Sequence, residues 1–179
     1  MSKKILLVSG SPRKGNTEYV LRKIYAELPD KKELLLLREK KIGHCQGCLK
    51  CEKTFACVIR DEMRGALKAV EQCDFLVIGT PRYYDNISGL FKDFIDRLLP
   101  LDYKNALKGK KIFMIMVGGE SAKSTEKYLK FTMAGFVKYM ELDLAGTCCF
   151  RALNQGELEK NPATIKKIKD IVKIIIKSY

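Results

Sequence analysis

Five short apolar runs alternate along the chain with amphipathic segments, and this alternation predicts the secondary structure. The runs are almost continuously apolar, which is typical of strands buried on both faces of a parallel sheet. They predict strands at residues 5–9, 33–37, 75–79, 112–117 and about 142–150. Between them, a helical spacing of apolar positions predicts helices over about 16–28, 61–72, 88–99, 123–140 and 162–177.

Strands that alternate with helices through the whole chain predict one doubly wound α/β domain over residues 1–179. A cysteine-rich insertion at about 38–60 interrupts the alternation after the second strand. Sheets of this kind bind ligands at the carboxyl ends of their strands, where the strand order reverses. The loops after the first, third and fourth strands are therefore the candidate site.

The loop after the first strand, residues 9–17, has the composition of a phosphate-binding turn that opens a helix. Gly10 and Gly15 allow a close backbone approach to a ligand, and the free N–H groups of the following helix point at the same place. The loop offers hydroxyl and amide groups from Ser9, Ser11, Asn16 and Thr17, and positive charge from Arg13 and Lys14. The alternative is an ordinary polar turn, which residues of these types often form.

The other two loops have residues suited to a flat ring. Tyr83 and Tyr84 in the loop 80–89 offer apolar faces with polar tips, and Gly118 and Gly119 leave room for a ring edge. Ordinary packing under a loop is the alternative for the tyrosines. The chain lacks a G-x-G-x-x-G fingerprint after the first strand, which favours a mononucleotide over a dinucleotide.

Net charge and composition limit the kinds of partner that are expected for this chain. The chain has 34 Lys and Arg against 21 Asp and Glu, a net charge of +13, but these residues are scattered, so acidic redox proteins or phosphorylated cofactors are expected rather than nucleic acid. The apolar run after Lys4 is too short for a signal peptide, and no run is long enough to span a membrane. We therefore expect a cytoplasmic protein without membrane partners.

Four of the seven cysteines are closely spaced in the insertion, as C-x2-C-x2-C-x5-C: Cys45, Cys48, Cys51 and Cys57. Closely spaced cysteines in a reducing compartment often bind metal, and iron–sulfur clusters use compact runs of four thiolates. A structural zinc site, loop packing and reactive thiols are the alternatives. His44 is a candidate proton donor or ligand, or neither. Small apolar packing accounts best for the other three cysteines, Cys73, Cys148 and Cys149.

The chain resembles the flavodoxin-like NAD(P)H-dependent FMN reductases, and most closely their iron–sulfur flavoprotein branch. The residues that carry the resemblance are SGSPRKGNT at 9–17, GTPRYYDNISGLFKDFIDR at 79–97, VGG at 117–119, and CQGCLKC with Cys57. The resemblance implies a five-stranded parallel sheet in the order 2-1-3-4-5 with FMN at its carboxyl edge. It also implies that Gly118 and Gly119 lie by the pyrimidine side of the flavin. The phosphate would be bound by Ser9, Ser11, Arg13, Asn16 and Thr17. The flavin ring would be bordered by Pro81, Tyr83, Tyr84, Asn86 and Ile87. Arg82 departs from the family, whose loops often carry an uncharged residue there.

The resemblance implies a [4Fe–4S] cluster on the four cysteines. The leading hypothesis is an FMN-dependent oxidoreductase that takes electrons from a ferredoxin-like carrier through the cluster to FMN and on to an acceptor. The alternatives are a cluster-free NAD(P)H-dependent FMN or quinone reductase and a non-enzymatic zinc- or flavin-bearing module. The resemblance also implies a homodimer or homotetramer. No side chain is required as an acid or base, so no catalytic residue is predicted.

Overall fold

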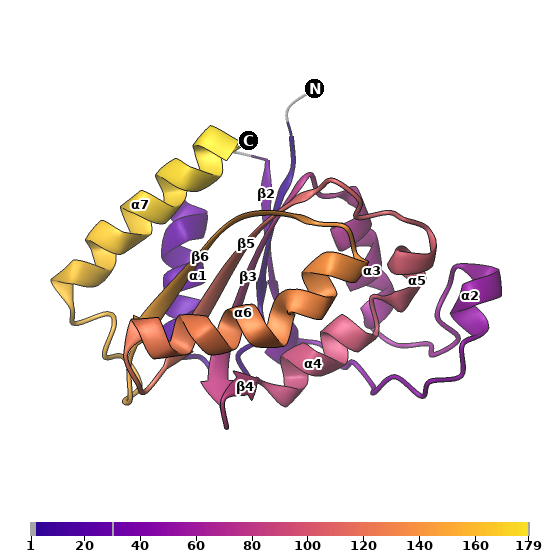
Figure 1. Cartoon of the computed structure of the whole chain (residues 1–179), viewed down its shortest axis with the longest axis horizontal. Helices are drawn as coiled ribbons and strands as arrows, with labels where there is room; N and C mark the ends of the chain where they lie inside the picture. The colour runs from indigo at the N-terminus through magenta and orange to yellow at the C-terminus, as the bar shows by residue number, and fades with distance from the viewer. Residues whose placement is uncertain (1–2, 30, 179) are drawn as a thin grey trace.

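The computed structural model describes residues 3–29 and 31–178; Met1 and Ser2, part of the N-terminal segment considered above, lie outside the described residues. A parallel sheet runs through the centre of the molecule with helices on both faces (Figure 1). Its five main strands are β1 (Ile5–Ser9), β2 (Lys32–Leu36), β3 (Phe75–Tyr83), β5 (Lys111–Gly118) and β6 (Asp143–Arg151). They lie in the order β2-β1-β3-β5-β6, which confirms the expected order of the first to fifth strands.

Helices cover the two faces of the sheet unequally (Figure 1). One face carries α1 (Asn16–Glu27) and α7 (Pro162–Ser178). The other carries α3 (Met63–Gln72), α4 (Gly89–Asp96) and α6 (Ala122–Tyr139). Three shorter helical pieces complete the fold: η1 (Leu37–Glu39), α2 (Lys50–Thr54) and α5 (Leu99–Tyr103).

The sheet separates two apolar cores, and successive strand residues enter them alternately. In β1, Leu6 and Val8 pack in the core beneath α3, α4 and α6, whereas Ile5 and Leu7 pack in the core beneath α1 and α7. All four side chains are fully buried. The continuous apolar runs in the sequence therefore reflect burial of both faces of the sheet, as expected.

Two elements differ from the sequence-based expectation. The helix expected over 88–99 is divided, because α4 ends at Asp96 and α5 begins at Leu99 with Pro100 in its first turn, a position that proline favours. Strand β3 extends past Gly79 to Tyr83, because its end pairs with a short antiparallel strand, β4 (Asn86–Ile87), which was not expected. None of the described helices is both long and apolar enough to cross a membrane.

Candidate functional site

A cleft lies at the carboxyl edge of the sheet, between the loops that follow β1, β3, β5 and β6. Eight of the twelve residues predicted to bind a cofactor line it together: Ser11, Arg13, Asn16, Thr17, Pro81, Tyr83, Gly118 and Gly119. The remaining four, Ser9, Tyr84, Asn86 and Ile87, are not among its lining residues. Three loops that are far apart in the sequence therefore meet at one place.

The loop 9–17 is folded by its own polar groups. The Ser11 hydroxyl donates a hydrogen bond of 2.7 Å to the Arg13 carbonyl. Gly15 stands in an extended conformation directly before α1, without a side-chain cap. The first N–H groups of a helix have no partner within the helix, and here they lie beside the cleft lined by Asn16 and Thr17. This end of the cleft is suited to an anion.

Two of the predicted phosphate ligands are placed differently from the rest. Asn16 donates from Nδ2 to the Asn154 carbonyl at 2.8 Å and accepts at Oδ1 from the Leu158 N–H at 3.3 Å. Its side chain therefore holds the loop after β6 in place. Ser9 is buried at the end of β1, and its hydroxyl has no hydrogen-bond partner among the described residues.

The opposite wall of the cleft combines Pro81 and Tyr83 with the two glycines. A Cβ on Gly118 would lie 3.0 Å from the Thr125 hydroxyl oxygen, and one on Gly119 would lie 2.5 Å from a Leu153 methyl carbon. A side chain at Gly118 or Gly119 would therefore press against α6 or against Leu153. Both glycines line the cleft.

The remaining predicted ring contacts lie on a hairpin beside the cleft. Tyr84 is fully exposed at its tip and has a left-handed backbone, as does Asp85. Asn86 is exposed, and Ile87 is buried in the core beneath α4 and α6. Contact between these residues and a flavin stays a prediction.

Arg82 joins the hairpin to the loop after β5. Its guanidinium forms an ion pair with Asp85, donates to Glu120 at 3.2 Å, and lies 4.2 Å from the centre of the Tyr128 ring. The side chain is almost completely buried. Burial alone would lower the pKa of Arg82, but the hydrogen bonds and charges of Asp85 and Glu120 raise it. Arg82 therefore stays positively charged and connects two walls of the cleft, the hairpin β3–β4 and the loop after β5.

Sequence reasoning missed the fourth wall, which Ala152 and Leu153 form after β6. The Ala152 N–H donates to the Gly118 carbonyl at 2.8 Å, so the two loops are directly connected. The available signal was topological, because the end of the fifth predicted strand lies at the same edge of the sheet as the other loops.

The four clustered cysteines lie in one turn-rich segment, residues 45–57, which we call the cysteine segment. Gly47, Leu49 and Phe55 all have left-handed backbones, and the last two bracket the short helix α2. Such conformations are costly for residues other than glycine and are concentrated at functional sites. Cys45 and Cys48 are exposed, whereas Cys51 is buried.

The four thiols are close enough to influence one another electrostatically. Burial raises the pKa of Cys51, a backbone hydrogen bond lowers it, and the negative charges of Cys57, Cys45 and Cys48 raise it further. Among the described residues, no group of three or more His, Cys, Asp or Glu side chains is arranged to hold a single metal ion.

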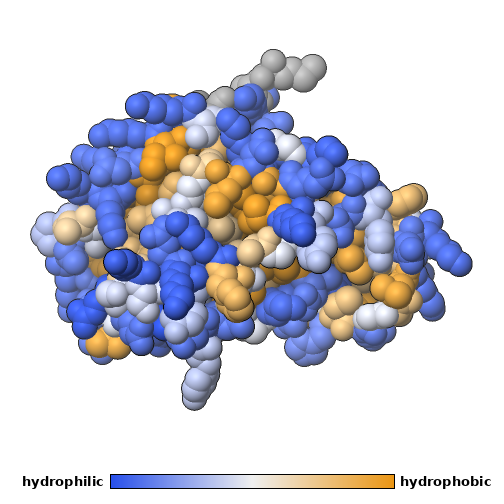
Figure 2. All heavy atoms as spheres, viewed as in Figure 1, coloured by the Kyte–Doolittle hydropathy of each residue, from blue (hydrophilic) through white to orange (hydrophobic). Residues whose placement is uncertain are grey.

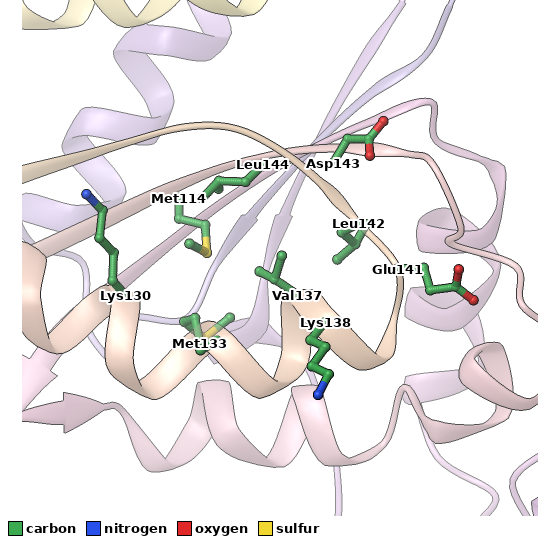
Figure 3. A pocket seen from close by; sticks show the side chains of 10 residues that line it. Met114, Lys130, Met133, Val137, Lys138, Glu141, Leu142, Asp143 and Leu144 are labelled. Atoms are coloured by element: carbon green, nitrogen blue, oxygen red, sulfur yellow. The ribbon is translucent and has the colours of Figure 1, made fainter.

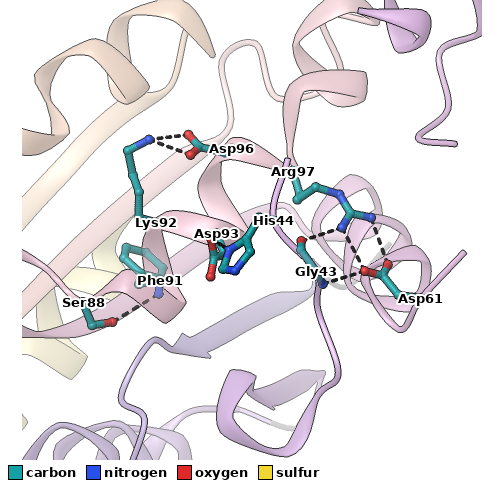
Figure 4. A network of polar contacts seen from close by, with 9 residues as sticks. All are labelled: Gly43, His44, Asp61, Ser88, Phe91, Lys92, Asp93, Asp96 and Arg97. Atoms are coloured by element: carbon teal, nitrogen blue, oxygen red, sulfur yellow. Dashed lines mark hydrogen bonds and ion pairs between the residues drawn. The ribbon is translucent and has the colours of Figure 1, made fainter. Parts of the chain in front are cut away.

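Both ends of the cysteine segment are attached to the helix α4 (Figure 4). Arg97, which follows α4, donates to the Gly43 carbonyl at 2.7 Å and to both oxygens of Asp61 at 2.8 and 2.9 Å. Asp61 also accepts from the Gly43 N–H at 2.8 Å. His44 Nδ1 lies 2.7 Å from Asp93 of the same helix, and this contact raises the pKa of His44.

The other three cysteines have the packing environments expected from the sequence. Cys73 and Cys149 are buried, and Cys148 packs against the core beneath α1 and α7. Burial raises the pKa of Cys73 to about 11 and that of Cys149 to about 12. Both therefore remain protonated, unreactive thiols at neutral pH.

A larger hollow lies between α6 and the first residues of the edge strand β6 (Figure 3). Its floor is apolar and belongs to the apolar area in the middle of the face shown in Figure 2. The floor residues are Met114, Met133, Val137, Leu142 and Leu144. The hollow lies away from the carboxyl edge of the sheet and brings together no candidate ligands for a cofactor.

Comparisons with known proteins agree with this arrangement. The family described as NADPH-dependent FMN reductase matches residues 3–171. An iron-sulfur flavoprotein of Archaeoglobus fulgidus is 38% identical over 107 residues, which cover 58% of this chain and 49% of that protein. The match thus spans about half the length of that relative. An iron-sulfur flavoprotein of Clostridioides difficile is 29% identical over 177 residues, which cover 95% of this chain and 75% of that protein.

Solved structures share the fold at low sequence identity. The Trp repressor binding protein of Bacillus subtilis superposes with a TM-score of 0.69 at 21% identity, covering 92% of this chain and 95% of that one. General stress protein 14 of Treponema denticola, solved in complex with FMN, superposes with a TM-score of 0.60 at 17% identity, covering 95% and 98%. These likenesses establish the flavodoxin-like architecture.

Proposed function

Because the chain belongs to the NADPH-dependent FMN reductase family, we propose that it is an oxidoreductase that binds FMN in the cleft at the carboxyl edge of its sheet. The observation that carries this proposal is that the start of α1 meets Pro81, Tyr83 and the two glycines in one cleft. FMN, when bound, supplies the transfer of one or two electrons. The chain's own residues bind and orient it.

The two ends of the cleft divide this work. Ser11, Arg13 and the N–H groups at the start of α1 bind the phosphate, where the helix dipole and the Arg13 charge favour an anion. Pro81, Tyr83 and the two glycines enclose the ring. The Asn16 side chain supports the phosphate end indirectly, by fixing the loop after β6.

We propose further that Cys45, Cys48, Cys51 and Cys57 hold a [4Fe–4S] cluster, which supplies transfer of single electrons when bound. The support is the compact C-x2-C-x2-C-x5-C spacing and the two relatives named as iron-sulfur flavoproteins. The electron source would then be a small ferredoxin-like carrier, or NAD(P)H. A net charge of +13 favours encounter with an acidic carrier.

A cluster-free NAD(P)H-dependent FMN or quinone reductase is the second candidate. The absence of any single-ion site among the described side chains favours it, as does a neighbouring structure named NADH:FMN oxidoreductase. In this case the cysteine segment would have a structural role and hydride would reach the flavin directly.

Iron, acid-labile sulfide, zinc and FMN measured on anaerobically purified protein separate the candidates. The proposal predicts stoichiometric FMN together with iron and sulfide. We expect Cys48→Ser to remove the iron and leave FMN bound, whereas the matched control Cys148→Ser, which lies outside the cysteine segment, should keep both. FMN without iron would support the cluster-free reductase, and a protein that binds no FMN would contradict both.

A further inference from the structure

Arg97 is a buried charge that the proposed chemistry does not use. Its side chain is 1% exposed, and arginine is almost never fully buried unless it is paired. Asp61 provides the pairing through two hydrogen bonds. The Arg97 Nε has no hydrogen-bond partner among the described residues. Stability alone does not explain a buried Arg97–Asp61 pair, because apolar residues of similar size often stabilise a core as well as a buried ion pair does.

The surroundings of Arg97 connect it to both flanks of the cysteine segment. Gly43 lies just before the segment and accepts from the guanidinium, and Asp61 lies just after the segment and pairs with it. Asp61 also accepts from the Gly43 N–H at 2.8 Å, so the two flanks of the segment are joined directly to each other. One side chain thus holds both flanks of the segment.

The helix that Arg97 follows is also attached to the loop 9–17. Ser88, the residue that caps α4, donates from its hydroxyl to the Gly10 carbonyl at 2.5 Å. It accepts from the Phe91 N–H at 3.1 Å (Figure 4). Gly10 belongs to the phosphate-binding loop. The eight residues of α4 span about 12 Å. The loop 9–17 and the cysteine segment are therefore attached to opposite ends of one short helix.

We propose that Arg97 is a positioning residue that fixes the cysteine segment at a set place relative to the flavin cleft. The planar guanidinium suits this role, because it donates in several fixed directions at once, which a lysine ammonium does not. The functional meaning of this placement rests on the proposed electron-transfer role of the segment. The placement itself does not depend on what the segment binds.

The test compares wild type with Arg97→Lys and Arg97→Gln by hydrogen exchange on the anaerobically purified protein. Loss of charge-assisted hydrogen bonds should raise exchange in residues 43–61 by roughly tenfold or more. Exchange in residues 9–17 should stay unchanged. Arg97→Lys should not restore slow exchange in residues 43–61, since lysine keeps the positive charge but lacks the planar guanidinium that donates to Gly43 and Asp61 together. Lys92→Gln is the matched control, because Lys92 lies on the same helix with an exposed partner, Asp96.

A second readout follows iron and the reduction potential. If the segment holds a cluster, Arg97→Lys should lower the iron content per FMN. In the fraction that keeps iron, it should shift the cluster potential while the FMN potential stays the same, because the potential of a cluster depends on the charge and solvent exposure around it and Arg97 is attached to the segment.

The exchange data test the role of Arg97, and the iron content tests the cluster. Unchanged exchange in residues 43–61 in both Arg97 variants would overturn the positioning role. So would a uniform rise that includes residues 9–17 together with a collapse of the melting temperature, because Arg97 would then hold the whole fold. If Arg97→Gln does not fold, Arg97→Lys and Asp61→Asn carry the same test. Wild-type protein without iron would refute the cluster, and the exchange data would still decide the role of Arg97.

Discussion

Glu18 shows how one buried carboxylate is stabilised at the start of α1. Its side chain is 1% exposed and lies 2.8 Å from Arg22 and 2.7 Å from Arg38. Burial alone would raise its pKa, but hydrogen bonds from Arg38 and Arg22 lower it below the ordinary value of 4.5. The ionised carboxylate therefore contributes to stability, and it links α1 to the segment after β2.

A pH-dependent stability difference follows from Glu18. We expect Glu18→Gln to destabilise the protein by roughly 1–3 kcal/mol near neutral pH, because it removes charge-assisted hydrogen bonds. Since the folded pKa is depressed, this contribution is present above the unfolded value of about 4.5 and is lost as the pH falls through the lower folded value. Urea unfolding of both proteins from pH 7 to pH 3 should show the difference shrinking below pH 4.5.

Glu27→Gln is the control, because Glu27 lies exposed at the end of the same helix. Its unfolding free energy should follow that of wild type throughout. A difference for Glu18→Gln that stays constant down to pH 3 would show that the carboxylate charge is not involved.

Gly10 gives a second prediction, on packing. A Cβ at Gly10 would lie 2.5 Å from the Phe91 Cβ, so we expect Gly10→Ala to destabilise by roughly 1–3 kcal/mol. Gly65, in α3, has open space around it, and Gly65→Ala should instead stabilise by roughly 0.5–1 kcal/mol. Thermal melts of the two variants should therefore shift in opposite directions, and a shared direction would contradict the packing described for Gly10.

At the residue scale, the sequence indicates which residues line the cleft better than it indicates which side chains contact one another. It placed Ser11, Arg13 and Thr17 at the cleft because loops after parallel strands share an edge. It could not show that the side chain of Asn16 would be used by the loop after β6, because that partner lies more than 130 residues away. From the sequence, Gly10 was expected to let a ligand approach the backbone. In the structure, the Phe91 side chain occupies the space next to Gly10.

Among the elements, the hairpin β3–β4 and the loop after β5 depend on one another through Arg82. We expect Arg82→Met to weaken FMN binding by about tenfold, because the two walls of the cleft would no longer be held in place before binding. Arg64→Met, an exposed change on α3, is the control. Quenching of FMN fluorescence on titration measures both. Equal affinity for FMN in wild type and Arg82→Met would mean that the contacts of Arg82 do not organise the cleft.

Element positions could be predicted from the sequence to within a few residues, since long apolar runs and helical spacing are local signals. The break between α4 and α5 had a local signal in Pro100, which is tolerated only in the first turn of a helix. The strand β4 had none, because two residues form a strand only through pairing with β3. The attachment of the cysteine segment to α4 depends on Arg97 and Asp61, which are 36 residues apart.

For the whole molecule, charge leads to a prediction about partners. With a net charge of +13, reduction by an acidic ferredoxin should slow by roughly tenfold or more as ionic strength rises from about 0.01 to 0.5 M. Reduction by a small neutral reductant should change little over the same range. Stopped-flow absorbance of the flavin follows both reactions, and an equal salt response would exclude electrostatic steering.

The fold as a whole follows from the order of strands and helices, and the cleft follows from the fold. The central claim is that FMN lies at the carboxyl edge of this sheet with its phosphate at the start of α1. A crystal structure of the FMN-loaded protein tests it most directly. The account predicts the phosphate within hydrogen-bonding distance of the backbone N–H groups of residues 13–17, and the ring between Tyr83 and the glycines 118 and 119. FMN bound instead in the hollow between α6 and β6 would contradict it.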